Sequence, residues 1–150
     1  MKSARIFAAV VGISIAVGAA TLHASDAMKA VVGSYLEIQA KLASDKTDGL
    51  KASATALATR AEGLGDAGAP IAKAAKAVAD APDLKAAREA FGPLSDAVLA
   101  AAKAEGFKDL GDVKLAYCPM VKQSWLQKGD KIANPYYGAA MPTCGEFKKP

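Results

Sequence analysis

The sequence predicts a mainly α-helical protein, an antiparallel four-helix bundle with an irregular, aromatic-rich C-terminal lobe. Over residues 26–106, apolar residues recur at alternating steps of three and four, the spacing of one face of an α-helix. The same part is rich in Ala, which is a strong helix former. Most aromatic residues and both Cys gather instead in residues 107–150. We therefore expect one domain overall, with a helical bundle over 25–106 and a Cys/Met motif lobe over 107–150 packed on it.

The first 24 residues have the pattern of a secretory signal peptide. Lys2 and Arg5 precede a stretch without charge, and small residues lead into the polar sequence that begins at Ser25. The apolar run is short for a membrane span, which needs about 20 apolar residues. We expect export through the inner membrane to the periplasm, cleavage near residue 24 and no stable membrane insertion afterwards. An uncleaved membrane anchor is the alternative.

Four apolar seams divide the bundle into helices. They cover residues 28–42, 50–64, 71–81 and 84–101. Asp26 is expected to cap the first helix, because its carboxylate can accept from free backbone N–H groups. Pro70 suits the first turn of the third helix. At Gly92-Pro93 a proline inside the fourth seam removes a hydrogen bond, so a kink or short break is expected there. Short links between the helices favour antiparallel packing.

The C-terminal lobe does not follow a helical period. Val113, Leu115 and Tyr117 alternate and predict a short strand. Gly, Asn and Pro recur after this strand as turn signals. Trp125 and Leu126 are expected on a helical turn between them. The result is an irregular lobe folded back on the bundle.

The composition excludes several function classes. Without Lys2 and Arg5, the mature chain has 17 basic and 15 acidic residues, a net charge of +2, and its Lys residues are spread out. This is not the footprint of a nucleic-acid-binding protein. The single histidine, His23, falls in the signal peptide, so the mature chain lacks the usual general base near neutral pH. There is no Cys-X-X-Cys redox motif and no P-loop. We expect a protein that is not an enzyme.

Four sulfur atoms lie in two short clusters, each containing a proline. Cys118 and Met120 form the first cluster, and Met141 and Cys144 form the second. Copper(I) is a soft cation that prefers thiolate and thioether donors. The four sulfur residues are therefore candidate metal ligands, and Trp125 with the nearby tyrosines would shield the ion from water.

The two cysteines also allow a different interpretation. An even Cys count in an exported protein favours a disulfide, and closing the 26-residue loop from Cys118 to Cys144 would stabilise the fold by roughly 3 kcal/mol. The interpretations compete, because an oxidised pair offers no thiolate; oxidation would switch the metal site off. A sulfur–sulfur distance of about 2 Å indicates a disulfide. About 3.5–4.5 Å, with both Met sulfurs nearby, indicates a metal pocket, since metal–sulfur bonds are about 2.3 Å.

Five separated elements of the lobe occur in a recognisable order. They are Tyr117-Cys118-Pro119-Met120, then Trp125-Leu126, then Ile132 with Asn134-Pro135-Tyr136-Tyr137-Gly138, then Met141, and Cys144-Gly145. This order resembles the signature of a bacterial periplasmic domain family of unknown function. Its members occur alone or attached to periplasmic adaptor subunits of copper and silver efflux systems. Arg88 and Ser95 also lie in a stretch similar to that family's last helix. The stretch between Met120 and Trp125 is shorter here than in many members.

The resemblance implies a helical N-terminal region followed by the motif-bearing tail, with copper(I) as cofactor and copper or silver efflux components as partners. The metal ligands it implies are Cys118, Met120, Met141 and Cys144. The supporting shell it implies is Tyr117, Trp125, Asn134, Tyr136 and Tyr137. The leading hypothesis is a periplasmic copper-binding protein that acts as a chaperone, a buffer or an efflux accessory. The alternative is a disulfide-stapled helical module that binds a protein partner without metal.

Overall fold

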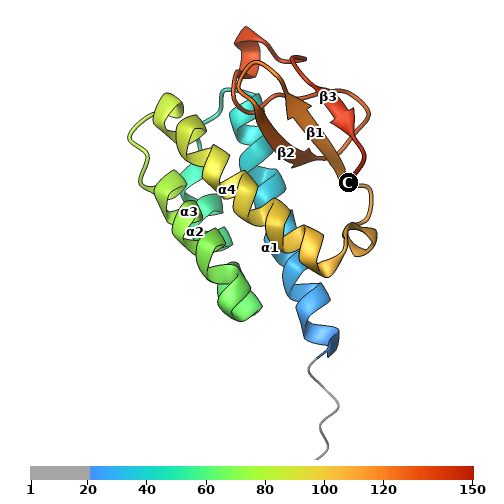
Figure 1. Cartoon of the computed structure of the whole chain (residues 1–150). Helices are drawn as coiled ribbons and strands as arrows, with labels where there is room; N and C mark the ends of the chain where they lie inside the picture. The colour runs from blue at the N-terminus through green and yellow to red at the C-terminus, as the bar shows by residue number, and fades with distance from the viewer. Residues whose placement is uncertain (1–20) are drawn as a thin grey trace, which may run out of the picture.

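Four α-helices and a small sheet form the fold (Figure 1). The computed structural model describes residues 21–150, with side chains from Asp26 onward, so the expected signal peptide lies almost entirely outside the described residues. The helices are α1 (Thr21–Ala43), α2 (Leu50–Ala61), α3 (Ala69–Ala79) and α4 (Leu84–Glu105). α1 packs against α2 and α4, and α3 packs against the same two helices. The prediction of a mainly helical protein is confirmed.

A predicted helix cap and a predicted helix break are wrong. Asp26 does not cap α1, because it lies inside the helix, where it pairs with Lys29 at 3.7 Å. α4 is not broken at Gly92-Pro93 but continues through the proline. The flanking Phe91 is fully buried, and packing of an apolar face outweighs the local cost of one missing hydrogen bond. The predicted proline in the first turn of α3 is confirmed.

The core lies between the helices and follows the predicted seams. Its largest fully buried apolar side chains in the helices are Tyr35, Phe91, Met28, Ile38, Leu42, Leu57, Ile71 and Leu94. The rings of Tyr35 on α1 and Phe91 on α4 stack with their centroids 5.2 Å apart. The many Ala residues between these side chains allow the helices to approach closely.

The C-terminal lobe contains a three-stranded antiparallel sheet and is therefore more regular than predicted. Its strands are β1 (Lys114–Cys118), β2 (Gln123–Gln127) and β3 (Glu146–Lys148), in the order β2-β1-β3. The predicted strand around Leu115 corresponds to β1. The predicted helical turn at Trp125-Leu126 is wrong, because both residues lie in β2 and pair with β1. Trp125, Leu126 and Gln127 are all buried, so β2 lacks the alternation that reveals a strand in a sequence.

A buried hydrogen-bond network joins the sheet to the helices. The hydroxyls of Tyr35 and Ser95 lie 2.6 Å apart, and Ser95 donates to the backbone oxygen of Ser124 at 2.8 Å. The N–H of Leu126 donates to the Tyr35 hydroxyl at 3.2 Å, and the Tyr136 hydroxyl donates to Ser124 at 3.0 Å. Burial, the largest effect, raises the pKa of the Tyr35 phenol, so this hydroxyl stays neutral. The network holds β2 in one position over α1 and α4.

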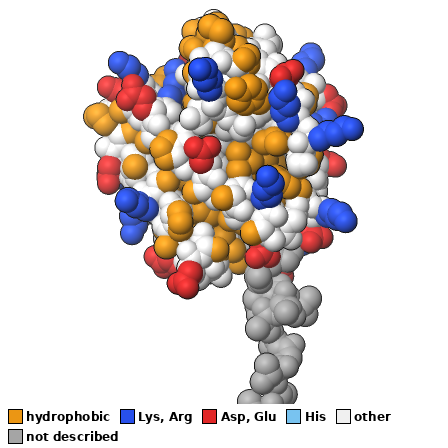
Figure 2. All heavy atoms as spheres, in the orientation of Figure 1, with side chains coloured by type: hydrophobic (Ala, Val, Ile, Leu, Met, Phe, Trp, Pro, Cys, Tyr) orange, Lys and Arg blue, Asp and Glu red, His pale blue; other side chains and the backbone are white. Residues whose placement is uncertain are grey.

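The surface carries charges of both signs. On the face shown in Figure 2, Lys and Arg side chains are interspersed with Asp and Glu, and apolar side chains gather between them. Within residues 21–150, no helix is both long enough and apolar enough to cross a membrane.

Candidate functional site: a cysteine pair beside the sheet

The pairing of the strands brings the two cysteines together. Cys118 is the last residue of β1, and its side chain is buried on the same face as that of Ala116. β3 pairs antiparallel with β1, with Tyr117 opposite Glu146. Continuing this register by one residue sets Gly145 opposite Cys118, so Cys144 arrives beside Cys118. Two cysteines 26 residues apart in the chain thus meet at one end of β1.

The two sulfur atoms are in contact but are not bonded. The Sγ atoms of Cys118 and Cys144 lie 3.0 Å apart, and both cysteines are free thiols. This distance is longer than a disulfide bond of about 2 Å. It is shorter than the separation of about 3.5–4.5 Å expected for two sulfurs that share one metal ion. The distance between the two sulfurs therefore matches neither a disulfide nor a pair that shares one metal ion.

The environments of the two thiols differ. Cys118 is fully buried, whereas Cys144 is half-buried. Burial raises the pKa of Cys118, but the hydrogen bond with Cys144, the backbone N–H groups of Val121 and Met120 and the Asn134 amide together bring it below the usual value. The hydrogen bond with Cys118, followed by burial, raises the pKa of Cys144. Of the two thiols, Cys118 therefore loses its proton more readily than Cys144.

The two methionines of the predicted site lie near the surface. Met120 belongs to the 119–122 loop that joins β1 to β2, and 65% of its surface is exposed. Met141 is half-buried at the end of the short helix Gly138–Ala140. Both lie between the two cysteines in the chain, but neither thioether is part of the buried core. Within residues 21–150, no three side chains of His, Cys, Asp or Glu cluster as a metal site.

Asn134 connects the segments around the cysteines. Its fully buried amide donates through Nδ2 to the backbone oxygen of Cys144 at 2.6 Å. Its Oδ1 accepts from the N–H groups of Tyr136 at 2.8 Å and Tyr137 at 3.2 Å. Its own N–H donates to the oxygen of Pro142 at 2.9 Å. One side chain therefore closes the 134–138 turn and fixes the backbone that carries Cys144.

Trp125 and Gly145 shape the inner side of the site. Trp125 is fully buried, and its ring meets that of Tyr136 edge-on at 6.0 Å. Gly145 has φ 143°, and a Cβ on it would lie 2.8 Å from Trp125 and 3.0 Å from the oxygen of Tyr117. Only glycine allows this approach without strain. Trp125 thus sets how closely the residues after Cys144 can approach β1.

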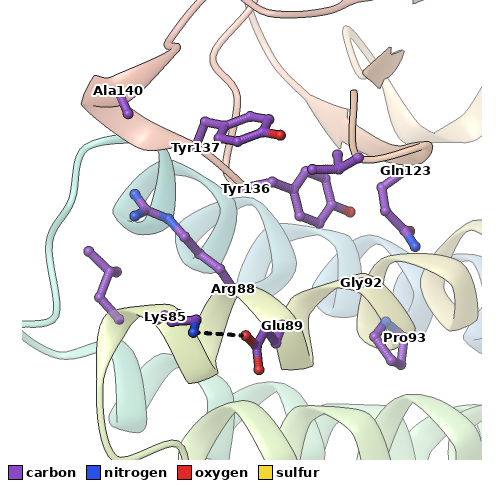
Figure 3. A pocket seen from close by; sticks show the side chains of 11 residues that line it. Lys85, Arg88, Glu89, Gly92, Pro93, Gln123, Tyr136, Tyr137 and Ala140 are labelled. Atoms are coloured by element: carbon purple, nitrogen blue, oxygen red, sulfur yellow. Dashed lines mark ion pairs between the residues drawn. The ribbon is translucent and has the colours of Figure 1, made fainter. Parts of the chain in front are cut away.

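The three tyrosines of the predicted shell lie on the other face of the sheet or along a groove. Tyr117 alternates with Cys118 along β1, so its side chain lies on the other face of the sheet, where the ammonium of Lys148 is 5.7 Å from its ring. Tyr136 and Tyr137 line an open groove of about 720 Å³ between α4 and the lobe (Figure 3). Val121, next to Met120, lines the same groove.

Sequence reasoning missed the polar residues that hold the lobe in place. Arg88 on α4 donates to the backbone oxygens of Pro135 at 3.1 Å and Leu42 at 2.7 Å, and it pairs with Asp45. Gln127, nearly fully buried, accepts from the Trp125 indole at 2.9 Å. The position of Arg88 within the stretch similar to a known family was the one available signal. The partners are mostly backbone oxygens, which leave no trace in a sequence.

Comparisons with family models, with curated proteins and with solved structures find no match for this chain.

Proposed function

We propose that this protein binds a soft metal ion, copper(I), through the thiolates of Cys118 and Cys144. The supporting observation is the contact between their sulfur atoms, 3.0 Å apart and reached from two separate segments of the chain. Thiolates are the donors that copper(I) prefers over oxygen and amine groups. Because one member of the pair, Cys144, is only half-buried, an ion can reach the two sulfurs from solvent.

Met120 and Met141 are the proposed additional donors. Met120 is a large apolar side chain that is 65% exposed, which has no packing benefit. It lies two residues from Cys118 in a four-residue loop, and its backbone N–H contacts the sulfurs of both cysteines, so its side chain starts near the pair. Bound copper would supply soft Lewis acidity at this edge of the sheet. Tyr136 and Trp125 would limit access of water from the inner side.

In this proposal the four helices form an antiparallel bundle that serves as scaffold, and the lobe carries the metal. The signal-peptide pattern of residues 1–24 supports action in the periplasm. A chaperone, a buffer or an accessory of copper and silver efflux fits a small protein with one surface-accessible ion. Efflux components are the partners that the motif resemblance suggests.

A copper(I) titration in competition with a chromophoric chelator tests the proposal. The reduced protein should take up one copper(I). Replacing Cys118 or Cys144 by Ser should lower the affinity by more than about tenfold, which is about 1.4 kcal/mol of binding free energy. Met120→Leu should lower it less, because a thioether is a weaker donor than a thiolate. Met28→Leu is the matched control, since this methionine lies in the helical core. Equal affinities for all five proteins would refute the site.

The second candidate function is a metal-free module stapled by a Cys118–Cys144 disulfide that binds a protein partner. It is favoured by the same distance, because a movement of about 1 Å closes the bond. Intact mass of protein isolated from the periplasm distinguishes the two. Loss of two hydrogens, with no metal uptake either before or after reduction, would support the stapled module and exclude the copper site.

A further inference from the structure

The two sulfurs of the pair differ in their access to solvent. The side chain of Cys118 is fully buried, beneath the 119–122 loop and beside Asn134. The side chain of Cys144 is half-buried, and the residues before it, Pro142 and Thr143, are exposed. A reagent from solvent therefore meets Cys144 first. Access is one determinant of which sulfur reacts in thiol–disulfide exchange, beside the fraction of each thiol that is ionised.

We propose that the pair exchanges disulfides with low-molecular-weight thiols and disulfides, with Cys144 as the sulfur that forms the mixed disulfide and Cys118 as the resolving sulfur. Only the consequence of this exchange, which is control of copper binding, rests on the proposed function. The chemistry itself needs no metal.

Oxidation proceeds in two balanced steps. Cys144 passes its proton across the 3.0 Å contact to the Cys118 thiolate, and the Cys144 thiolate so formed attacks one sulfur of an external disulfide RSSR. A Cys144–SR bond forms, and the S–S bond of RSSR breaks to release RS⁻. Cys118 then loses its proton, its thiolate attacks the Cys144 sulfur, the Cys118–Cys144 bond forms, and a second RS⁻ leaves. The protein loses two electrons and two protons, and RSSR becomes two RSH. Reduction is the reverse, with RS⁻ attacking Cys144 and the electron pair of the broken bond passing to Cys118.

The structure prepares Cys118 for the resolving step. Its sulfur is already 3.0 Å from that of Cys144, which is the distance of a near-attack arrangement. β1 is paired on both sides, so the backbone of Cys118 is held in place. Asn134 holds the Cys144 carbonyl at 2.6 Å. An intramolecular attack between two fixed groups is much faster than attack by a second external molecule.

Exchange would switch the metal site. In the reduced state both thiolates are available, whereas in the oxidised state neither is. The same external couple that sets the redox state therefore determines whether copper(I) binds.

The test uses the full-length mature protein and oxidised glutathione in a buffer with a metal chelator. Cys118→Ala should trap glutathione on Cys144, whereas Cys144→Ala should form the adduct at least about tenfold more slowly, because the remaining thiol is buried. Wild-type protein should lose two hydrogens and retain no glutathione. Equal or faster adduct formation by Cys144→Ala would overturn the assignment.

Two further measurements remove the dependence on how the variants fold. In concentrated urea both variants should react at similar rates, which shows that the fold causes the difference. Wild-type reduced protein treated with limiting iodoacetamide should be labelled first at Cys144, as located by peptide mass spectrometry; first labelling at Cys118 contradicts the proposal. Because no step contains metal, exchange without copper binding refutes only the copper function, and copper binding without ordered exchange refutes only this inference.

Discussion

Asn134→Ala is the substitution that most directly tests how the site is assembled. The variant removes three hydrogen bonds, those to the oxygen of Cys144 and from the N–H groups of Tyr136 and Tyr137. Each is worth about 1 kcal/mol net, so the folded state should lose roughly 3 kcal/mol. The amide is fully buried, and within residues 21–150 every buried side-chain N and O atom has a partner. The substitution would therefore leave the backbone groups that now pair with the Asn134 amide without a partner.

Urea unfolding followed by circular dichroism measures this effect. The midpoint should fall at unchanged slope, because the surface exposed on unfolding stays the same. In a thermal scan the loss corresponds to about 9–11 °C for a chain of this size. Gln123→Ala is the control, because this amide lies in the same lobe and forms no side-chain hydrogen bond within the described residues. A loss below about 1 kcal/mol for Asn134→Ala would refute the view that Asn134 holds the lobe together.

Three further predictions concern stability. Gly145→Ala should cost at least about 2 kcal/mol, because its Cβ would collide with Trp125 at a positive φ; urea unfolding measures the loss, and a neutral result contradicts the tight approach. Asp83→Ala should cost about 1 kcal/mol by removing the cap of α4, again by urea unfolding. The hydrogen bond from Arg88 lowers the pKa of Asp45, so this carboxylate stabilises the fold above its unfolded pKa of about 3.9 and the benefit is lost as the pH falls through the lower folded value. Asp45→Asn should therefore unfold at a lower temperature than wild type at pH 7 but at the same temperature near pH 2, and a constant difference would contradict the assignment.

The helical part of the fold was predictable because it depends on a long and regular signal. Seams of apolar residues over 10 or more positions specify both the type of element and its buried face. The wrong predictions are those in which a single residue is used to predict where an element ends or which type it has. Pro93 did not break α4, because burial on both sides of it outweighs a local penalty. The sequence predicts a turn at Trp125, because a five-residue strand whose last three residues are all buried carries no alternation.

The sequence marks the two cysteines as residues that could pair, but it does not reveal the geometry that brings them together. The two Cys-Met clusters indicated which sulfurs to consider, and the structure brings the cysteine pair into contact. The register between β1 and β3, which causes this contact, depends on a three-residue strand that no pattern marks. The supporting roles of Asn134 and Arg88 depend on backbone oxygens of distant segments. Such partners become visible only when the chain is folded.

Met120 is the residue whose position separates the two functions proposed for the cysteine pair. A structural disulfide needs only Cys118 and Cys144, and it is best served by a loop of small polar residues above it. Instead, the loop presents a thioether that is 65% exposed and so is accessible from solvent. A soft-metal site gives this exposure a purpose, because a flexible sulfur at the entrance can capture an ion and pass it to the buried thiolate. If Met120→Leu leaves copper(I) uptake unchanged while Cys144→Ser abolishes it, the pair binds the metal without its loop, and the exposed side chain needs a different explanation, such as contact with a partner.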